Sequence, residues 1–243
     1  MKYIFFILLI IANLYGKNPI QSPTFDEILK PIIEDKKYIF DDENITIEVP
    51  NFADNPVQVP IFVDAKKIKN AKQLILFADL NPIPVIVDMK LIELLPLISI
   101  NIKVAQETPI RALVLDDKNI WHIASKNIKS FGGGCSVASL SSNNNDFIKF
   151  LGKTKINSFE NGEITRLKAS IFHPMETGLI FGKNEFFINK ITIFANNKNI
   201  SQIKTYSAIS ENPRFIFETK EKTNDYKIEF FDVDGNSFIA QTK

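Results

Sequence analysis

Residues 57–64, with the sequence VQVPIFVD, give the clearest indication of the fold. Val57, Val59, Ile61 and Val63 recur at every second position, which is the spacing of one face of a half-buried β-strand. Similar short runs follow at residues 74–78, 84–87, 99–104, 110–115 and 120–124, and again at 163–172, 186–196, 214–219, 226–233 and 237–241. Helical periodicity is nearly absent from both groups, so the sequence predicts an all-β fold.

Turn signals separate these strands and divide the chain into two halves. Asn81-Pro82 is one such signal, and residues 232–236 fit a hairpin turn with Gly235 at the left-handed position. About seven short strands at this spacing suit an immunoglobulin-like sandwich of roughly 100 residues. We predict two immunoglobulin-like β-sandwich domains in tandem, at residues 22–130 and 152–243, connected by a Gly-Cys arm and a Ser/Asn-rich linker at residues 131–151.

The N-terminus has the composition of an export signal. Lys2 supplies a positive end, and residues 3–14 form an almost unbroken apolar run, which is shorter than the about 20 residues of a membrane span. Gly16 is a tolerable residue for cleavage. We expect residues 1–16 to be a Sec-type signal peptide and the mature protein to be periplasmic and free of the membrane, with a retained anchor helix as the alternative.

A short helix is predicted directly after this segment. Ser22 is a capping residue, Pro23 suits the first helical position, and Asp26 and Glu27 follow in the first turn. Pro31 should limit the length of the helix.

Composition excludes several classes of function. The 243 residues include 29 Lys and Arg and 28 Asp and Glu, so the net charge of +1 gives no general attraction to nucleic acid. No glycine-rich phosphate loop is present. With two histidines and one cysteine, a zinc site would need an unusual set of carboxylates. We expect neither a metal nor a cofactor.

The single cysteine, Cys135, directly follows Gly132, Gly133 and Gly134. Glycines cannot bury a thiol with side chains of their own, and they allow a slender backbone to enter a narrow channel of another protein. A lone cysteine in an exported protein cannot form an internal disulfide, so it is either reactive or incidental. The pattern favours an exposed thiol on a flexible arm.

The two histidines offer a competing hypothesis, a self-contained thiol enzyme. His122 lies on a predicted strand, where a histidine ordinarily faces solvent or a partner, and His173 precedes Pro174, which favours an extended backbone. Neither is linked to Cys135 by local spacing, and a mobile thiol cannot keep a fixed base. This favours a carrier on which other proteins perform the chemistry.

Several stretches resemble two families of sulfur-oxidation proteins. The second half resembles SoxZ in LKASI (residues 167–171), HPMETGL (173–179), ENPRF (211–215) and DVDG (232–235). The first half resembles SoxY in VPIFV (59–63), NPIP (81–84), KVA (103–105) and the glycine-cysteine arm. Together these stretches cover almost all of the mature chain.

The resemblance implies a fused SoxY–SoxZ carrier that is not itself an enzyme. Cys135 would be the attachment residue for thiosulfate-derived sulfur, and Gly132, Gly133 and Gly134 would be the swinging arm. The implied partners are a haem c-containing SoxAX cytochrome that conjugates thiosulfate, a SoxB hydrolase that removes sulfate, and a sulfur dehydrogenase. It also implies that the two domains pack together, and we expect HPMETG to have a fold or contact role.

Two alternatives stay open. The usual SoxY arm ends the polypeptide, whereas Ser136 and a whole second domain follow Cys135 here. Fused carriers associated with quinoprotein dehydrogenases are similar around the cysteine. A two-domain immunoglobulin-like periplasmic chaperone or binding protein would share the size and the signal, would recognise its partner by strand addition and would not need Cys135.

Overall fold

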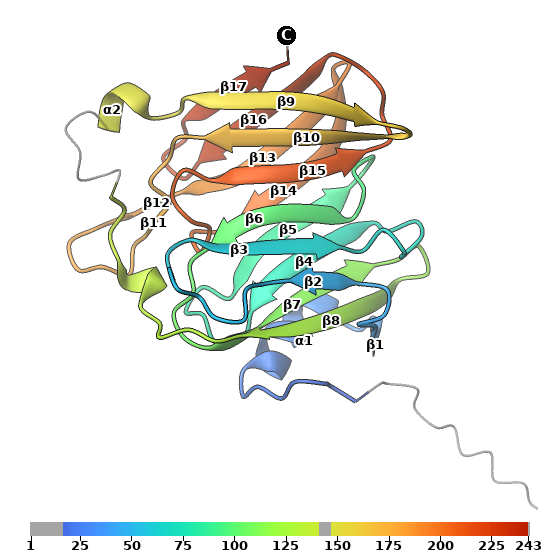
Figure 1. Ribbon diagram of the computed structural model, residues 1–243, viewed down its shortest axis with the longest axis vertical. Coiled ribbons are helices and arrows are strands. Elements are labelled where there is room, and N and C mark those ends of the chain that lie inside the picture. Colours follow the sequence, from blue (N-terminus) through green and yellow to red (C-terminus); the bar gives the residue numbers. More distant parts are fainter. Residues whose placement is uncertain (1–16, 141–146, 243) are drawn as a thin grey trace, which may run out of the picture.

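A computed structural model describes residues 17–140 and 147–242 of the chain. The predicted signal peptide at residues 1–16 and part of the predicted linker lie outside the described residues. The described chain forms two stacked β-sheets, one with nine strands and one with six, and a small two-stranded hairpin beside them (Figure 1). The predicted all-β, immunoglobulin-like fold is confirmed.

The elements of the first half are α1 (Phe25–Ile33), β1 (Lys37–Phe40), β2 (Thr46–Glu48), β3 (Val59–Asp64), β4 (Gln73–Ala78), β5 (Val85–Leu91), β6 (Leu97–Ile102), β7 (Thr108–Leu115) and β8 (Ile120–Ile128). The predicted linker contains a 3-10 turn, η1 (Gly134–Ser136), and a short helix, α2 (Phe147–Phe150). The second half contains β9 (Thr154–Asn161), β10 (Ile164–Ile171), β11 (Glu176–Thr177), β12 (Glu185–Phe186), β13 (Ile188–Ala195), β14 (Lys198–Thr205), β15 (Arg214–Thr219), β16 (Tyr226–Asp232) and β17 (Ser237–Gln241).

Both large sheets run through both halves of the chain. Their strand orders are β1-β8-β7-β4-β5-β14-β13-β16-β17 and β2-β3-β6-β15-β10-β9. The halves meet where β5 pairs antiparallel with β14, and where β6 pairs with β15 at Ser99 and Ile216. The expected packing of the two halves is thus edge to edge, and the strands of one sandwich continue the sheets of the other (Figure 1).

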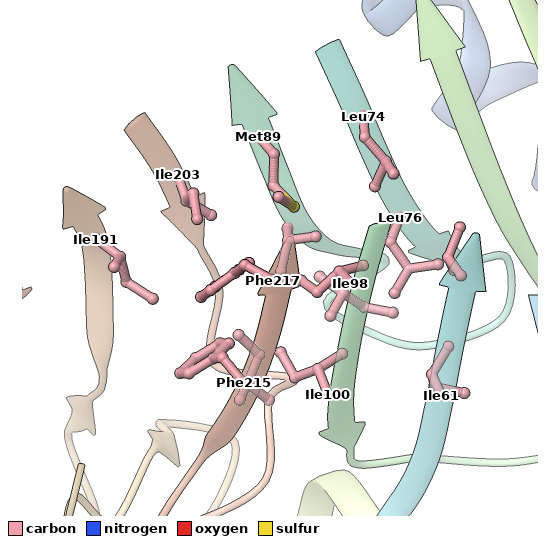
Figure 2. Close-up of a cluster of buried hydrophobic side chains, with 14 of the residues drawn as sticks. Ile61, Leu74, Leu76, Met89, Ile98, Ile100, Ile191, Ile203, Phe215 and Phe217 are labelled. Atoms are coloured by element: carbon pink, nitrogen blue, oxygen red, sulfur yellow. The ribbon is translucent and has the colours of Figure 1, made fainter. Parts of the chain in front are cut away.

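A single large hydrophobic core fills the space between the sheets and crosses the junction. Figure 2 shows Leu76 and Ile98 of the first half close to Phe217 of the second. These side chains are fully buried. Because each buried aliphatic or aromatic side chain contributes roughly 1.5–3 kcal/mol, the junction is stabilised like the interior of one domain.

The helix α1 begins later and extends further than predicted. Its N-cap is Thr24 rather than Ser22, and the Thr24 hydroxyl donates to the carbonyl oxygen of Asp79 (2.6 Å) instead of capping the helix. Pro31 lies inside the helix, at an exposed position. A proline nitrogen has no proton to donate to the carbonyl oxygen four residues earlier, but on the exposed side of the helix that oxygen can bond water instead. The buried face, with Phe25 and Leu29, packs on a second, smaller core.

Among residues 17–140 and 147–242, no helix has the length and apolar character needed to cross a membrane.

Candidate functional site

Cys135 lies in η1, and its backbone is bonded to Thr177 of the β11–β12 hairpin. Its relative solvent exposure is 0%. The prediction of an exposed thiol is therefore wrong for this conformation. The physical reason is that the arm is docked along the chain instead of extending into solvent.

Backbone hydrogen bonds hold the docked arm against the segment that follows β6. The amide of Gly133 donates to the carbonyl oxygen of Ala105 (3.0 Å), and the amide of Gly134 donates to that of Val104 (3.0 Å). Val104 in turn donates to the carbonyl oxygen of Pro56 (2.8 Å). The arm is thus held to the first half by the backbone amides of two successive glycines.

The three glycines, predicted to give flexibility, allow this close approach. A Cβ atom on Gly134 would lie 2.1 Å from the carbonyl oxygen of Pro56, and one on Gly132 would lie 2.3 Å from that of Ala105. Gly133 faces open space but has a φ of +87°, a backbone region that favours glycine. At two of the three positions any side chain would prevent docking.

Groups from both halves surround Cys135. Its Sγ, a weak donor, lies 3.8 Å from the carbonyl oxygen of Lys103, in the first half. Its own carbonyl oxygen accepts a hydrogen bond from the Thr177 hydroxyl (3.0 Å), in the HPMETGL stretch. The contact role expected for that stretch therefore includes direct contact with the cysteine.

Lys103 connects the halves beneath the cysteine. Its side chain is buried, and its Nζ donates to the carbonyl oxygens of Met175 and Ser207, the latter at 3.0 Å. Burial lowers the pKa of Lys103 to about 8, although the nearby Cys135, Glu176 and Glu211 favour the charged form. The ammonium is thus retained at neutral pH in a largely desolvated position.

The docked thiol is protonated and unreactive at neutral pH. Burial raises the pKa of Cys135 from 9.0 to about 11, and Lys103 only partly offsets this increase. Because the thiolate is the nucleophilic form of cysteine, the docked sulfur is chemically protected.

The segment after the cysteine is held by two carboxylates of the second half. The amide of Ser139 donates to Glu176 Oε1 (3.1 Å), and its hydroxyl donates to Glu211 Oε2. A pocket of about 180 Å³ borders Ser139, Glu211 and Lys103, and its other lining residues are Asn55, Val57, Gln58, Val137, Ala138 and Leu140. Part of the predicted flexible linker is therefore docked as well.

The structure places the two histidines in separate environments. His122 is half-buried rather than facing solvent, with Nδ1 2.7 Å from Asp41 Oδ2 and Nε2 3.4 Å from Asp116 Oδ2. His173 is buried, and its Nδ1 accepts from the amide of Met175 (3.2 Å). In the described part of the chain, no hydrogen bond joins either imidazole to Cys135.

Burial also determines the charge of His173. It lowers the pKa of His173 to about 4, although the Asp232 carboxylate, 3.7 Å from Nε2, favours the protonated form. The ring is therefore neutral at pH 7. Within the described ranges, no cluster of three or more His, Cys, Asp or Glu side chains could hold a metal ion.

Sequence reasoning did not find five residues of this site: Lys103, Ser139, Glu176, Thr177 and Glu211. Lys103, Glu176, Thr177 and Glu211 lie in stretches that carry the family resemblance, so the signal was present. What was missing was the pairing that brings these three stretches to one cysteine.

The fold and the site together define an immunoglobulin-like β-protein with one sequestered thiol at the junction of its halves. Residues 29–135 match the family model for the sulfur oxidation protein SoxY, and residues 154–243 match that for the sulphur oxidation protein SoxZ. The chain belongs to the SoxYZ family, as a fusion of the two partners, and is a sulfur-oxidation carrier.

Two solved structures show weaker likeness. The sulfur carrier protein SoxY from Chlorobium limicola f thiosulfatophilum is 19% identical, with a TM-score of 0.39 over 44% of this chain and 90% of its own. A structure of manganese lipoxygenase of Gaeumannomyces graminis with part of zonadhesin of Komagataella pastoris is 6% identical, with a TM-score of 0.21 over 82% of this chain and 92% of its own. No curated protein matches the chain.

Proposed function

We propose that this protein is a periplasmic carrier that holds thiosulfate-derived sulfur covalently on Cys135. The observation that carries the proposal is that the SoxY match ends at Cys135, the only thiol of the chain, at the tip of an arm with three glycines. The predicted export signal at residues 1–16 supports the periplasmic location.

Loading requires the arm to leave its docked position. In the docked state Cys135 has no solvent exposure and a raised pKa, so a partner enzyme could neither reach nor ionise it. The bonds that must break are few, chiefly those of Gly133, Gly134 and Ser139 and that of Thr177 to the Cys135 carbonyl. We therefore propose a swinging arm with a docked and a released state.

The proposed sequence of reactions uses separate enzymes. In the first step, a SoxAX-type cytochrome accepts two electrons as Cys–SH and thiosulfate form Cys–S–S–SO3⁻ and release one proton. In the second, a SoxB-type hydrolase adds water to the terminal sulfur–sulfur bond, which gives Cys–S–SH and hydrogen sulfate. A sulfur dehydrogenase then oxidises the remaining sulfane.

The positions of the histidines support a carrier rather than a thiol enzyme. His173 is buried and neutral beside Met175, and His122 is bonded to Asp41 on another part of the first half. Neither can act as a base on a sulfur that leaves the site.

Replacement of Cys135 tests the proposal. We expect Cys135→Ala to abolish sulfur-dependent oxidation by the partner enzymes, and the neighbouring Ser136→Ala variant to retain it. Undiminished oxidation with Cys135→Ala would refute the carrier and favour a chaperone or binding protein. Loss of loading in a folded His122→Gln variant would instead favour a self-contained thiol enzyme.

A further inference from the structure

We propose that His173 is a positioning residue for the docked arm: its ring nitrogen Nδ1 holds the backbone at Met175, so that the residues after Met175 contact the segment around Cys135. His173 would act through the HPMETGL stretch and not by contact with the sulfur. The inference deepens the proposed function, and it rests on that function only for the use of the docked state between loading reactions.

Three successive residues of this stretch connect to the arm or to the lysine beneath it. The carbonyl oxygen of Met175 accepts a hydrogen bond from Lys103 Nζ. Glu176 and Thr177, which follow, bond to the docked arm itself. Because these contacts come from consecutive residues, the direction of the backbone at Met175 decides whether they form together.

Met175 has an uncommon backbone conformation. Its φ is +53°, in the left-handed region, which is unfavourable for a residue with a Cβ atom. Such a conformation persists where the surroundings fix it. The amide of Met175 donates to His173 Nδ1 (3.2 Å), and its sulfur accepts from the amide of Ile188 (3.4 Å). Met175 is fully buried, so water could not replace the bond to Nδ1 if the imidazole were lost.

The ring of His173 is itself held with Nδ1 toward this amide. Its centre lies 4.4 Å from that of the Phe186 ring, and Nε2 lies 3.7 Å from Asp232 Oδ2. Asp232 is fixed in turn, because its Oδ1 accepts from the amides of Asp234 (3.0 Å) and Asn236 (2.8 Å). A neutral imidazole that accepts at Nδ1 carries its proton on Nε2, where the Asp232 carboxylate favours it.

Two variants of nearly the same shape separate this role from simple filling of the core. His173→Asn keeps an acceptor oxygen close to the place of Nδ1, whereas His173→Leu has no acceptor. Hydrogen exchange of the Gly134 amide, which donates to the carbonyl oxygen of Val104 in the docked arm, reports docking. The amide of Ile193 in β13, between β14 and β16, reports global unfolding.

We expect the Gly134 amide at pH 7 to exchange near the native rate in His173→Asn and about tenfold faster in His173→Leu, with equal Ile193 exchange in the two variants. Addition of Thr177→Val to His173→Leu should cause little further increase, because His173 acts through that contact. Equal Gly134 rates in the two variants, the same increase at Ile193 as at Gly134, or full multiplication of the two effects in the double variant would overturn the proposal.

The native chain provides a second measurement that does not depend on the folding of the variants. The nitrogen chemical shifts of the His173 ring at pH 7 should show a proton on Nε2 and none on Nδ1. A proton on Nδ1 would overturn the proposal, because that nitrogen could not accept from Met175. None of these measurements uses a sulfur compound, so a negative result would leave the carrier function of Cys135 standing.

Discussion

Cys135 combines a reactive group with a position that suppresses its reactivity. Burial keeps the thiol protonated, and the glycines that precede it provide the space for the backbone to dock. The sequence identified the cysteine and its glycines but not their state. A run of glycines in a sequence does not distinguish a flexible segment from one in close backbone contact. The carbonyl oxygens of Pro56 and Ala105 show that these glycines allow close backbone contact.

Substitution of the glycines should separate these two roles. Gly134→Ala would place a Cβ atom against the carbonyl oxygen of Pro56, whereas Gly133→Ala meets open space and costs only the about 1–2 kcal/mol of a left-handed residue. We expect alkylation of Cys135 at pH 7 to be at least about tenfold faster in Gly134→Ala than in Gly133→Ala, measured by mass spectrometry. Equal rates would mean that the docked arm does not protect the thiol.

The pH dependence of alkylation should report the docked state directly. If the thiol must undock before it ionises, docking of the protonated form raises the apparent pKa of Cys135, so the rate continues to rise with pH beyond 9.0. A permanently exposed thiol would level off near 9.0. We expect the first profile for the native chain and the second for Gly134→Ala; a native plateau near pH 9 would contradict docking.

Among the elements, the segment between β10 and β12, which contains β11, makes the contacts that cover the docked arm. Thr177 bonds the cysteine backbone, Glu176 bonds Ser139, and Met175 receives Lys103. Short strand-like runs predicted most strands, and β15 and β17 at their observed bounds. Weakly apolar strands such as β9 and β14 were missed, because their polar outer positions hide the period of two.

Loss of the Thr177 hydroxyl should loosen the arm without unfolding the protein. Thr177→Val removes the hydrogen bond to the Cys135 carbonyl, which typically contributes about 1 kcal/mol. We expect roughly fivefold faster exchange of the Gly134 amide, since 1.4 kcal/mol corresponds to about tenfold. Thr223→Val, at an exposed turn, is the matched control. Unchanged exchange in Thr177→Val would show that this contact does not hold the arm.

His173 should make the second half sensitive to acid. Its folded-state pKa of about 4 lies below its ordinary 6.5, so between these values the unfolded chain binds more protons than the folded one. The free energy of unfolding should therefore fall as the pH decreases from 6.5 to 4, by about 3 kcal/mol. Urea titrations should show this loss in the native chain and a smaller loss in His173→Asn; equal losses would exclude His173 as the cause.

At the scale of the whole molecule, the two halves share both sheets and one core. Sequence patterns predicted two sandwiches but not their junction, because β5 and β14 are more than 100 residues apart and pair only through the third dimension. The same limit applies to the site, whose residues come from both sides of that junction. The fusion keeps the cover and the arm in one chain.

This continuity predicts that the halves unfold together. Trp121, the only tryptophan, is buried in the first half, whereas circular dichroism reports the strands of both. We expect urea transitions followed by fluorescence and by circular dichroism to coincide. Phe217→Ala at the junction should lower the free energy of unfolding by about 3–5 kcal/mol and move both transitions to lower urea concentration. Two separated transitions would show that the halves are independent domains.

Intact-mass spectrometry shows whether sulfur travels on Cys135. Protein isolated from cells that oxidise thiosulfate is compared with the Cys135→Ser variant from the same cells. We expect added masses of thiosulfonate and persulfide on the native chain, mapped to Cys135 and absent from the variant. A native chain that stays unmodified while thiosulfate is consumed, or one whose adducts persist in Cys135→Ser, would contradict this expectation.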